Sequence, residues 1–254
     1  MPDRTEYAAG TPNWVDIQTS DPDAAKQFYT GLFGWEYDDQ PMPQGGNYSM
    51  AKLRGRDVAA IAPLPPQQGS PPHWNSYVAT PDIDAVVGRV DGAGGSVLMP
   101  PMDVMDAGRM AVVQDPTGAT IALWQAKNHI GAQTVNEPGS FTWNELQTPD
   151  VDKAAAFYAR VIGWDSQPFE GSDYTVFNNE GNGIGGAMKP PMEGIPANWV
   201  VYFAVDDTDA TVAKAKQQGG SVLAEPMDME GVGRIAVLAD PQGAVFAVIK
   251  NAQQ

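Results

Sequence analysis

Two acidic residues, Asp16 and Glu145, occupy equivalent places in two similar stretches of the chain. Each follows a tryptophan, Trp14 or Trp143, by two positions, in a segment where polar and apolar residues alternate. Burial among aromatic rings raises the pKa of a carboxyl group because it penalises the charged form, and such a group can act as a general base. We therefore take Asp16 as the candidate catalytic residue.

A structural role competes with this chemistry. Each acid recurs together with an arginine of its own half, Asp16 with Arg109 and Glu145 with Arg234. This recurrence favours a buried ion pair in each half, in which the arginine neutralises the carboxylate. Arg109 could equally bind an anionic substrate.

Both acids belong to an internal duplication. Residues 14–35 reappear as residues 143–164, at a shift of 129 positions (143 − 14), and ten of the 22 residues are identical. Residues 74–126 reappear as residues 199–251, at a shift of 125 (199 − 74), with 24 of 53 identical. A repeat of this length indicates two globular halves rather than a solenoid. We expect a first domain at residues 1–127, a linker at 128–139 and a second domain at 140–254.

Composition excludes several classes of protein. The chain has 254 residues, no cysteine and a net charge of −16, so it offers no disulfide and repels nucleic acids and anionic membranes. It has no apolar run long enough to span a membrane, and residues 1–10 lack the apolar stretch of a secretory signal. We expect a small-molecule ligand, no nucleic-acid or membrane partner, a monomer or homodimer, and a cytoplasmic location.

The helix and strand signals repeat with the duplication. Val15 and Ile17 alternate with polar residues, which predicts a half-buried strand. Asp21 then caps a helix with apolar residues at helical spacing, and Gly34 ends it. The first half continues with strands at 48–53, 58–62 and 75–79, a helix over 82–90, and strands at 96–98, 109–114 and 120–124. The second half repeats these signals, and we expect each half to have the order strand–helix–strand–strand–strand, twice over.

A series of short motifs along the first half carries a family resemblance. The motifs are Asp21-x-Asp23, Phe28-Tyr29 and Gly34-Trp35, followed by Gly108-Arg109 and Asp115-Pro116-x-Gly118-Ala119. The series resembles the glyoxalase/bleomycin resistance/dioxygenase superfamily, or vicinal oxygen chelate proteins, and both halves match it. The resemblance implies an α+β fold of two tandem glyoxalase-like domains. Each is a pair of βαβββ modules that form a cupped mixed sheet with the ligand site on its concave face.

The layout is also similar to that of two-domain glyoxalase-like antigens of mycobacterial culture filtrates. That similarity implies export without a standard signal as the alternative to a cytoplasmic location.

The resemblance also locates the positions of the family's metal ligands. Catalytic members hold a divalent metal between the first and last strands of their modules, and the corresponding positions here are Trp14, Asn75, Ala122, Trp143, Val200 and Ala247. Indole carries only a donor nitrogen, and alanine and valine carry no ligand atom. We therefore expect no metal and no cofactor.

Strand alternation proposes the residues that face each cup. An aromatic wall with a few polar groups is typical of a small-molecule site. The candidate ligand-binding residues are Trp14, Asp16, Gln18, Asn75, Tyr77, Arg109, Thr120 and Trp124 in the first half, and Trp143, Glu145, Gln147, Tyr202 and Arg234 in the second. Four further duplicated tryptophans are assigned to the core, namely Trp35, Trp164, Trp74 and Trp199.

Three functions remain open. The first is binding of an aromatic or carbonyl-containing metabolite or antibiotic in aromatic-lined cups without metal. The second is a lyase, isomerase or hydroxylase/dioxygenase that acts without metal or through atypical ligands such as His73 or Asp103. The third is a protein-interaction or antigen role with vestigial pockets.

Overall fold

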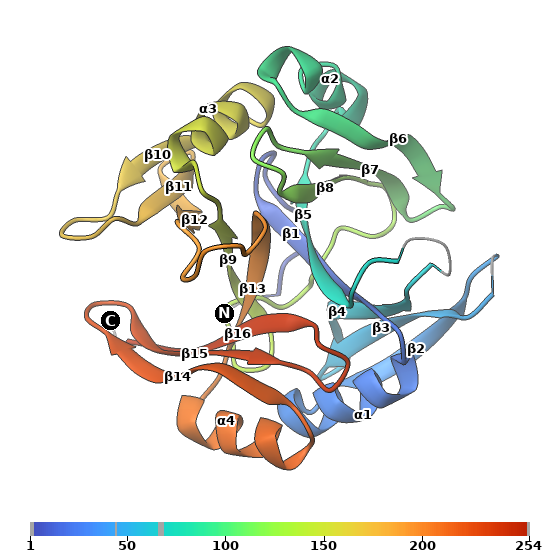
Figure 1. Ribbon diagram of the computed structural model, residues 1–254. Coiled ribbons are helices and arrows are strands. Elements are labelled where there is room, and N and C mark those ends of the chain that lie inside the picture. Colours follow the sequence, from blue (N-terminus) through green and yellow to red (C-terminus); the bar gives the residue numbers. More distant parts are fainter. Residues whose placement is uncertain (1–2, 44, 66–68, 253–254) are drawn as a thin grey trace.

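Two mixed sheets of eight strands form the molecule, one from each half of the chain (Figure 1). The computed structural model describes residues 3–43, 45–65 and 69–252. The strand orders are β2-β3-β4-β1-β5-β8-β7-β6 and β10-β11-β12-β9-β13-β16-β15-β14, so the two modules of each half share one sheet. This is the predicted α+β architecture of paired βαβββ modules.

The strands of the first sheet are β1 (Pro12–Thr19), β2 (Glu36–Pro41), β3 (Asn47–Leu53), β4 (Arg56–Pro63), β5 (His73–Ala79), β6 (Ser96–Val104), β7 (Gly108–Gln114) and β8 (Thr120–Ala126). Those of the second are β9 (Phe141–Gln147), β10 (Asp165–Pro168), β11 (Thr175–Asn179), β12 (Asn182–Met188), β13 (Asn198–Ala204), β14 (Ser221–Met229), β15 (Gly233–Ala239) and β16 (Val245–Asn251). The helices are α1 (Pro22–Phe33), α2 (Ile83–Val87), α3 (Val151–Val161) and α4 (Thr208–Gln217), with a short 3-10 helix, η1, at Asp91–Ala93.

Helix α1 begins and ends where the sequence predicts. The Asp21 side chain accepts a hydrogen bond from the Ala24 amide at 3.0 Å, and Pro22 occupies the first turn. Gly34 ends the helix in the left-handed conformation, with φ of 75°. In α3, Asp150 caps the Lys153 amide in the same way. Local capping therefore fixes both helices before any tertiary contact is considered.

The structure differs from the prediction at two places in the first half. Strand β2 was not predicted because its residues are polar and mostly exposed, so it carries no apolar alternation. Helix α2 covers only residues 83–87 of the predicted 82–90, because Gly88 ends it and the chain continues into η1. Backbone pairing to β3 holds β2 in place without help from a buried face.

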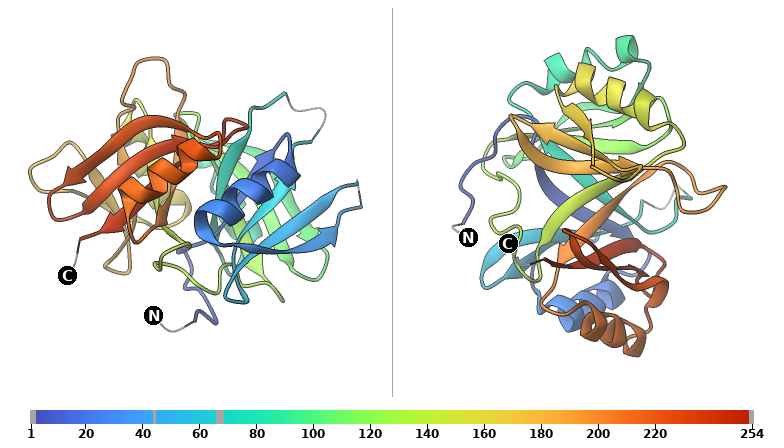
Figure 2. Two further views of the ribbon diagram at one scale, coloured as in Figure 1. Left: turned by 90° about the horizontal axis from the view of Figure 1, so that it is seen from below. Right: turned by 90° about the vertical axis from the view of Figure 1, so that its left-hand side faces the viewer.

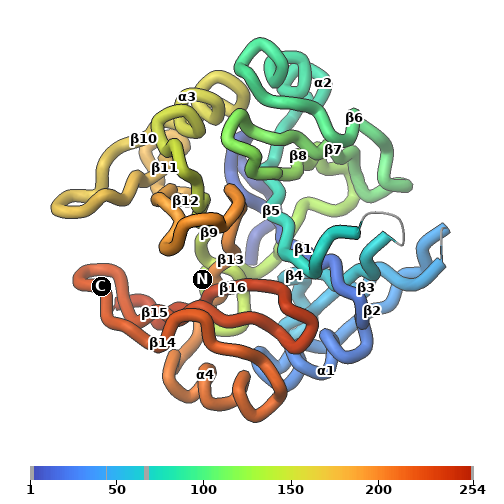
Figure 3. Tube along the Cα trace, viewed as in Figure 1, coloured from blue at the N-terminus to red at the C-terminus, as the bar shows by residue number. Residues whose placement is uncertain are grey.

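The helices pack across the two halves. Helix α1 lies beside α4, and α2 lies beside α3, so each helix layer joins a module of one half to a module of the other (Figures 1 and 2). The Cα trace shows the halves side by side with these pairs at opposite ends (Figure 3). The apolar residues of α1 share one cluster with those of β13, α4, β15 and β16. Those of α3 share a second with β5, α2, β7 and β8.

A tyrosine lies at the centre of each contact between halves. The Tyr29 hydroxyl donates to Asp240 Oδ2 at 3.1 Å and accepts from Trp74 Nε1 at 3.2 Å. Asp240 belongs to an Asp-Pro-x-Gly turn, and its Oδ1 accepts from the Ala244 amide at 2.9 Å. One carboxylate thus closes its own turn and binds the helix of the other half.

The second contact repeats this arrangement. The Tyr158 hydroxyl donates to Asp115 Oδ2 at 3.0 Å and accepts from Trp199 Nε1 at 3.1 Å. Trp35 and Trp164, at 1% and 2% exposure, lie in the same clusters. The assignment of these duplicated tryptophans to the core is confirmed.

None of the helices in the described part of the chain has the length and apolar content that crossing a membrane requires.

Replacing Tyr29 with Phe should test the contact between halves. The change keeps the ring but leaves Asp240 Oδ2 and Trp74 Nε1 buried without this partner, so the free energy of unfolding should fall by about 1–3 kcal/mol. Tyr158→Phe should cost a similar amount, and the two losses should add in the double variant because the sites are far apart. Urea unfolding measures all three. A loss below about 0.5 kcal/mol in both single variants would contradict the role of these hydroxyls.

Candidate functional site

A hydrogen-bonded cluster around Asp16 lies on the concave face of the first sheet, here called the first cup. The hydroxyls of Tyr77 and Tyr48 donate to Asp16 Oδ2 at 2.7 and 3.0 Å. Asn75 Nδ2 donates to Asp16 Oδ1 at 2.8 Å, and Trp14 Nε1 donates to the Tyr48 hydroxyl at 2.9 Å. Asp16 is 3% exposed, so protein donors replace water around its carboxylate.

Sheet register brings this cluster together. Strand β1 runs antiparallel to β5, with Trp14 opposite Tyr77 and Asp16 opposite Asn75. Strand β8 runs parallel to β5 and places Ala122 beside Tyr77. The predicted cup-facing residues of β1, β5 and β8 therefore share one face.

The second cup, on the concave face of the second sheet, contains the equivalent cluster around Glu145. The Tyr202 hydroxyl donates to Glu145 Oε2 at 2.9 Å, and Gln147 Nε2 donates to Oε1 at 3.2 Å. Trp143 Nε1 donates to the Tyr174 hydroxyl at 2.9 Å. The Tyr174 hydroxyl in turn hydrogen-bonds to Glu145, so the order tryptophan, tyrosine, carboxylate, tyrosine is the same in both halves.

Burial controls the ionisation of both carboxylates. Loss of solvent raises the pKa of Asp16, and hydrogen bonds from Asn75, Tyr77 and Tyr48 oppose that rise without cancelling it. Burial likewise raises the pKa of Glu145. The pKa of Tyr77 is held well above its usual value by burial first and by the nearby Asp16 charge second, so this phenol stays a donor.

Two members of these clusters, Tyr48 and Tyr174, are absent from the predicted site residues. Both lie between the two aligned blocks of the duplication, where the copies differ in length and similarity is weak. A signal did exist, because Tyr48 begins a predicted strand and stands 126 positions before Tyr174 (174 − 48). Sequence alone does not say which face of that strand meets the cup.

The remaining predicted residues of β1 and β8 lie at the edge of the first cup. Gln18 is half-buried and lies opposite His73, the next place along this face from Asp16. Thr120 is exposed at the start of β8. Neither position belongs to the hydrogen-bonded cluster around Asp16 described above.

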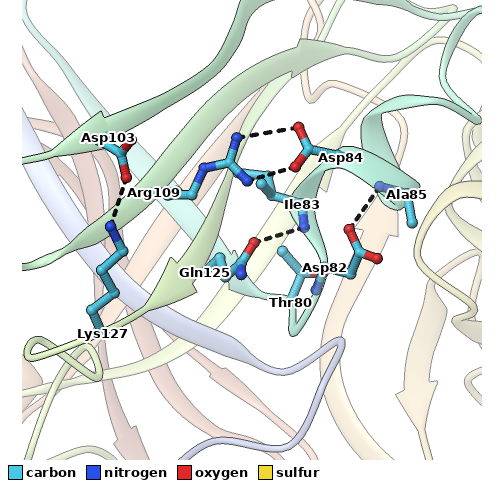
Figure 4. Close-up of polar contacts among 9 residues, drawn as sticks. All are labelled: Thr80, Asp82, Ile83, Asp84, Ala85, Asp103, Arg109, Gln125 and Lys127. Carbon is cyan, nitrogen blue, oxygen red and sulfur yellow. Dashed lines mark hydrogen bonds and ion pairs between the residues drawn. The ribbon is translucent and has the colours of Figure 1, made fainter.

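The predicted ion pair between Asp16 and Arg109 is wrong. Arg109 binds Asp84 of α2 through hydrogen bonds of 2.5 and 3.2 Å (Figure 4). The cause is strand alternation: Met110 lies opposite the cup residue Trp124, and Arg109, one position earlier, points to the helix side.

The pair between Glu145 and Arg234 is wrong for the same reason. Arg234 Nε and Nη2 donate to the two carboxylate oxygens of Asp209 on α4, at 2.5 and 2.9 Å. The duplicated arginines therefore attach the second helix of each half to the convex side of its sheet. Neither lines a cup.

Residues 127–129, which follow β8 and are here called the strap, cover part of the first cup. The backbone amides of Lys127 and His129 donate to the Ala107 carbonyl at 2.9 and 3.0 Å, and Trp124 Nε1 donates to the His129 carbonyl at 2.8 Å. The His129 ring packs edge-on against Trp14 with centroids 4.5 Å apart, and burial lowers its pKa. Trp14 and Trp124 are only 3% and 6% exposed as a result.

The second cup differs in its aromatic content and its access. Ile249 takes the place of Trp124, and Val200 takes the place of Asn75 opposite the carboxylate. Trp143 is half-buried, whereas its duplicate Trp14 is buried. A small apolar cluster that includes Val200 and Ile249 lines this cup.

The side chains at the family's metal positions do not fit a metal. Trp14 and Trp143 donate their only polar hydrogens to tyrosines, and Ala122 and Ala247 offer methyl groups. Within residues 3–43, 45–65 and 69–252, no group of three His, Asp or Glu side chains is placed to hold a metal ion. Asp103, an atypical ligand candidate, binds Lys127 at 2.7 Å (Figure 4).

Comparison with known proteins agrees with this fold. The pattern of the Glyoxalase/Bleomycin resistance protein/Dioxygenase superfamily matches residues 11–123 and again residues 131–248. The chain belongs to this superfamily.

Relatives from two groups of bacteria extend over nearly the whole chain. The chain is 57% identical over 260 aligned residues to "Putative glyoxylase CFP32" of Mycobacterium tuberculosis, covering 100% of both chains. It is 39% identical to the anthracycline biosynthesis protein DauV of a Streptomyces species, covering 97% of this chain and 95% of the relative.

Solved structures of the same fold include a metal-bound glyoxalase and a dioxygenase. A Mn(II)-bound glyoxalase from Novosphingobium aromaticivorans superposes with a TM-score of 0.70 at 17% identity, over 96% of this chain and 83% of that one. The 2,3-dioxygenase LapB from a Pseudomonas strain superposes with a TM-score of 0.66 at 13% identity, over 97% and 94%. At these identities the likeness shows the fold alone.

The raised pKa of Glu145 predicts a pH-dependent stability. In the unfolded chain this carboxyl ionises near its ordinary pKa of about 4.3, and in the folded chain it ionises at higher pH. As pH rises between these two values the unfolded state loses its proton first, so wild-type stability should fall relative to Glu145→Gln. The fall should be about 1.4 kcal/mol for each unit of pKa difference.

Urea unfolding of both proteins from about pH 4 to about pH 8 measures this difference. Asp16→Asn should show the same sign, because burial also raises the pKa of Asp16. A wild-type protein that gains stability relative to Glu145→Gln over this range would show that the folded state lowers the pKa instead.

Proposed function

We propose that the chain binds a small planar molecule carrying hydroxyl and carbonyl groups, and that it does so in the second cup. The observation that carries this proposal is the unequal access to two otherwise equivalent clusters. Trp14 is 3% exposed beneath the strap, whereas Trp143 is half-buried. A ligand can therefore contact the second indole without displacing the chain.

The chemistry of the second cup suits such a ligand. The partly exposed indole of Trp143 can stack on a planar ring, which contributes about 0.5–1.5 kcal/mol beyond the buried area. Val200, Ala247 and Ile249 supply apolar walls. Glu145 Oε1 holds a hydrogen bond of 3.2 Å from Gln147, and a ligand hydroxyl could replace this long bond with a shorter one to a charged acceptor.

The names of the relatives support this ligand class. One relative is named for anthracycline biosynthesis, and anthracyclines are planar polycyclic compounds with hydroxyl and carbonyl groups. The relative named as a glyoxylase points to a carbonyl compound. Both descriptions share a carbonyl group, and only the first requires an aromatic ring.

Binding of hydroxyanthraquinones tests the proposal. Isothermal titration of a hydroxyanthraquinone, with unsubstituted anthraquinone as the matched compound, should show tighter binding of the hydroxylated one. Trp143→Ala and Glu145→Gln should each weaken binding about tenfold, equivalent to about 1.4 kcal/mol. The matched variants Trp14→Ala and Asp16→Asn should change it less than about threefold. Equal losses from both cups, or no binding to any member of the series, would reject the proposal.

The same carboxylate supports a second candidate function, proton abstraction next to a carbonyl. A Glu145 carboxylate with a raised pKa is a stronger base than a solvated one and can take a proton from the carbon beside a bound carbonyl. Exchange of that carbon-bound hydrogen with deuterated water, followed by NMR, would detect the step. Exchange that persists unchanged in Glu145→Gln would exclude Glu145 as the base.

A further inference from the structure

The two helix pairs that join the halves are equivalent in sequence but differ in how closely they pack. At the contact of α1 with α4, the Gln218 side chain lies directly on Gly31. A Cβ added to Gly31 would come within 2.0 Å of Gln218 Oε1, so the amide occupies the space that a side chain would need. The Gln218 amide therefore fills the space between α1 and α4.

The contact of α3 with α2 and η1 is open at the corresponding place. Ala93 stands where the other contact has Gln218 (93 + 125), and Arg160 stands where it has Gly31 (31 + 129). The missing amide leaves a hollow of about 370 Å³. Its lining residues are Ala93, Gly94, Pro116, Lys153, Ala156, Phe157 and Arg160. Four of these seven positions differ from the closed contact, among them Ala93 in place of Gln218 and Arg160 in place of Gly31.

Two cations without acidic partners lie at this hollow. Lys153, which replaces Ala24 of the other contact, and Arg160 are both exposed on α3, two helical turns apart and separated by about 10 Å along its axis. Across the described residues, neither side chain takes part in an ion pair or hydrogen bond. Most of the other cations of this acidic chain are paired, as are Arg109, Lys127 and Arg234.

The buried acid next to the lining, Asp115, does not pair with them. Asp115 precedes Pro116, a lining residue, but its Oδ1 accepts from the amides of its own turn and its Oδ2 accepts from the Tyr158 hydroxyl. Its hydrogen bonds therefore keep it within the turn and the contact between halves. The apolar part of the lining comes from Phe157, Ala156 and Pro116.

We propose that this hollow binds a small, multiply charged organic anion with carboxylate or phosphate groups. Two cations favour more than one negative group, and a net charge of −16 repels anions everywhere that local cations do not outweigh it. The guanidinium of Arg160 matches the paired oxygens of a carboxylate or phosphate, and Lys153 supplies a second point charge. The site lies between the halves, on the convex side of both sheets, and is separate from the cups.

Titration with pyrophosphate and with citrate at constant ionic strength tests this site. Pyrophosphate tests for recognition of phosphate groups and citrate for recognition of carboxylate groups. At least one of them should bind with a stoichiometry of one per chain. Lys153→Ala/Arg160→Ala should weaken binding at least tenfold. The control Lys189→Ala/Lys214→Ala removes the same charge at exposed positions away from the hollow and should change binding less than about twofold.

A second variant copies the closed contact into the open one. Ala93→Gln/Arg160→Gly should fill the hollow with an amide, as Gln218 does over Gly31, and should abolish binding while thermal unfolding stays cooperative. Equal weakening by the control pair would show that the anions respond only to the net charge of the chain. No heat of binding in calorimetric titrations with either anion would show that there is no site. Either result overturns the proposal. Glu145→Gln should leave anion binding unchanged, which separates this site from the proposed function of the second cup.

Discussion

Crosswise burial of the convex sheet faces is the constraint on which the rest of this molecule depends. Each helix layer is shared between the halves: the apolar side of α1 packs with residues of both sheets, and so does that of α3. At each contact a tyrosine hydroxyl binds the carboxylate of an Asp-Pro-x-Gly turn from the opposite half. The helices occupy most of both convex faces in this way, so a ligand can reach that side at the hollow beside α3, whereas the concave faces stay free of helices.

The concave faces tolerate an ionisable group because phenols take the place of water. Asp16 and Glu145 each lie among tyrosine hydroxyls, and one tyrosine of each cluster, Tyr48 or Tyr174, accepts a hydrogen bond from a tryptophan. An unpaired buried charge is costly, and several hydrogen bonds reduce the cost without removing it. The net effect is a carboxyl group with a raised pKa, positioned by the sheet and independent of any arginine.

Local rules made much of the fold predictable. The caps at Asp21 and Gly34 and the alternation around Val15 depend on neighbouring residues, so the first helix and strand follow from sequence. Strand β2 was missed because its pairing to β3, not a buried face, holds it.

The site was predictable in part. Trp14, Asp16, Asn75 and Tyr77 share a face by period-two alternation, but the orientation of Arg109 depends on which of two adjacent residues faces the helix. Tyr48 could be assigned to the cup only by knowing which face of β3, two strands from β1 in the sheet, meets Asp16.

The paired tyrosine-to-aspartate bonds also bear on how such a chain arose. Each bond joins the first module of one copy to the second module of the other, which is the pattern that two identical single-copy subunits would make about a twofold axis. In a symmetric dimer any substitution alters both ligand faces together. Fusion into one polypeptide removes that restriction, so the two faces can differ. The first cup has Trp124, Asp16 and the strap, and the second has Ile249 and Glu145. Covalent linkage of the two copies therefore allows two sites to diverge that symmetry would have kept the same.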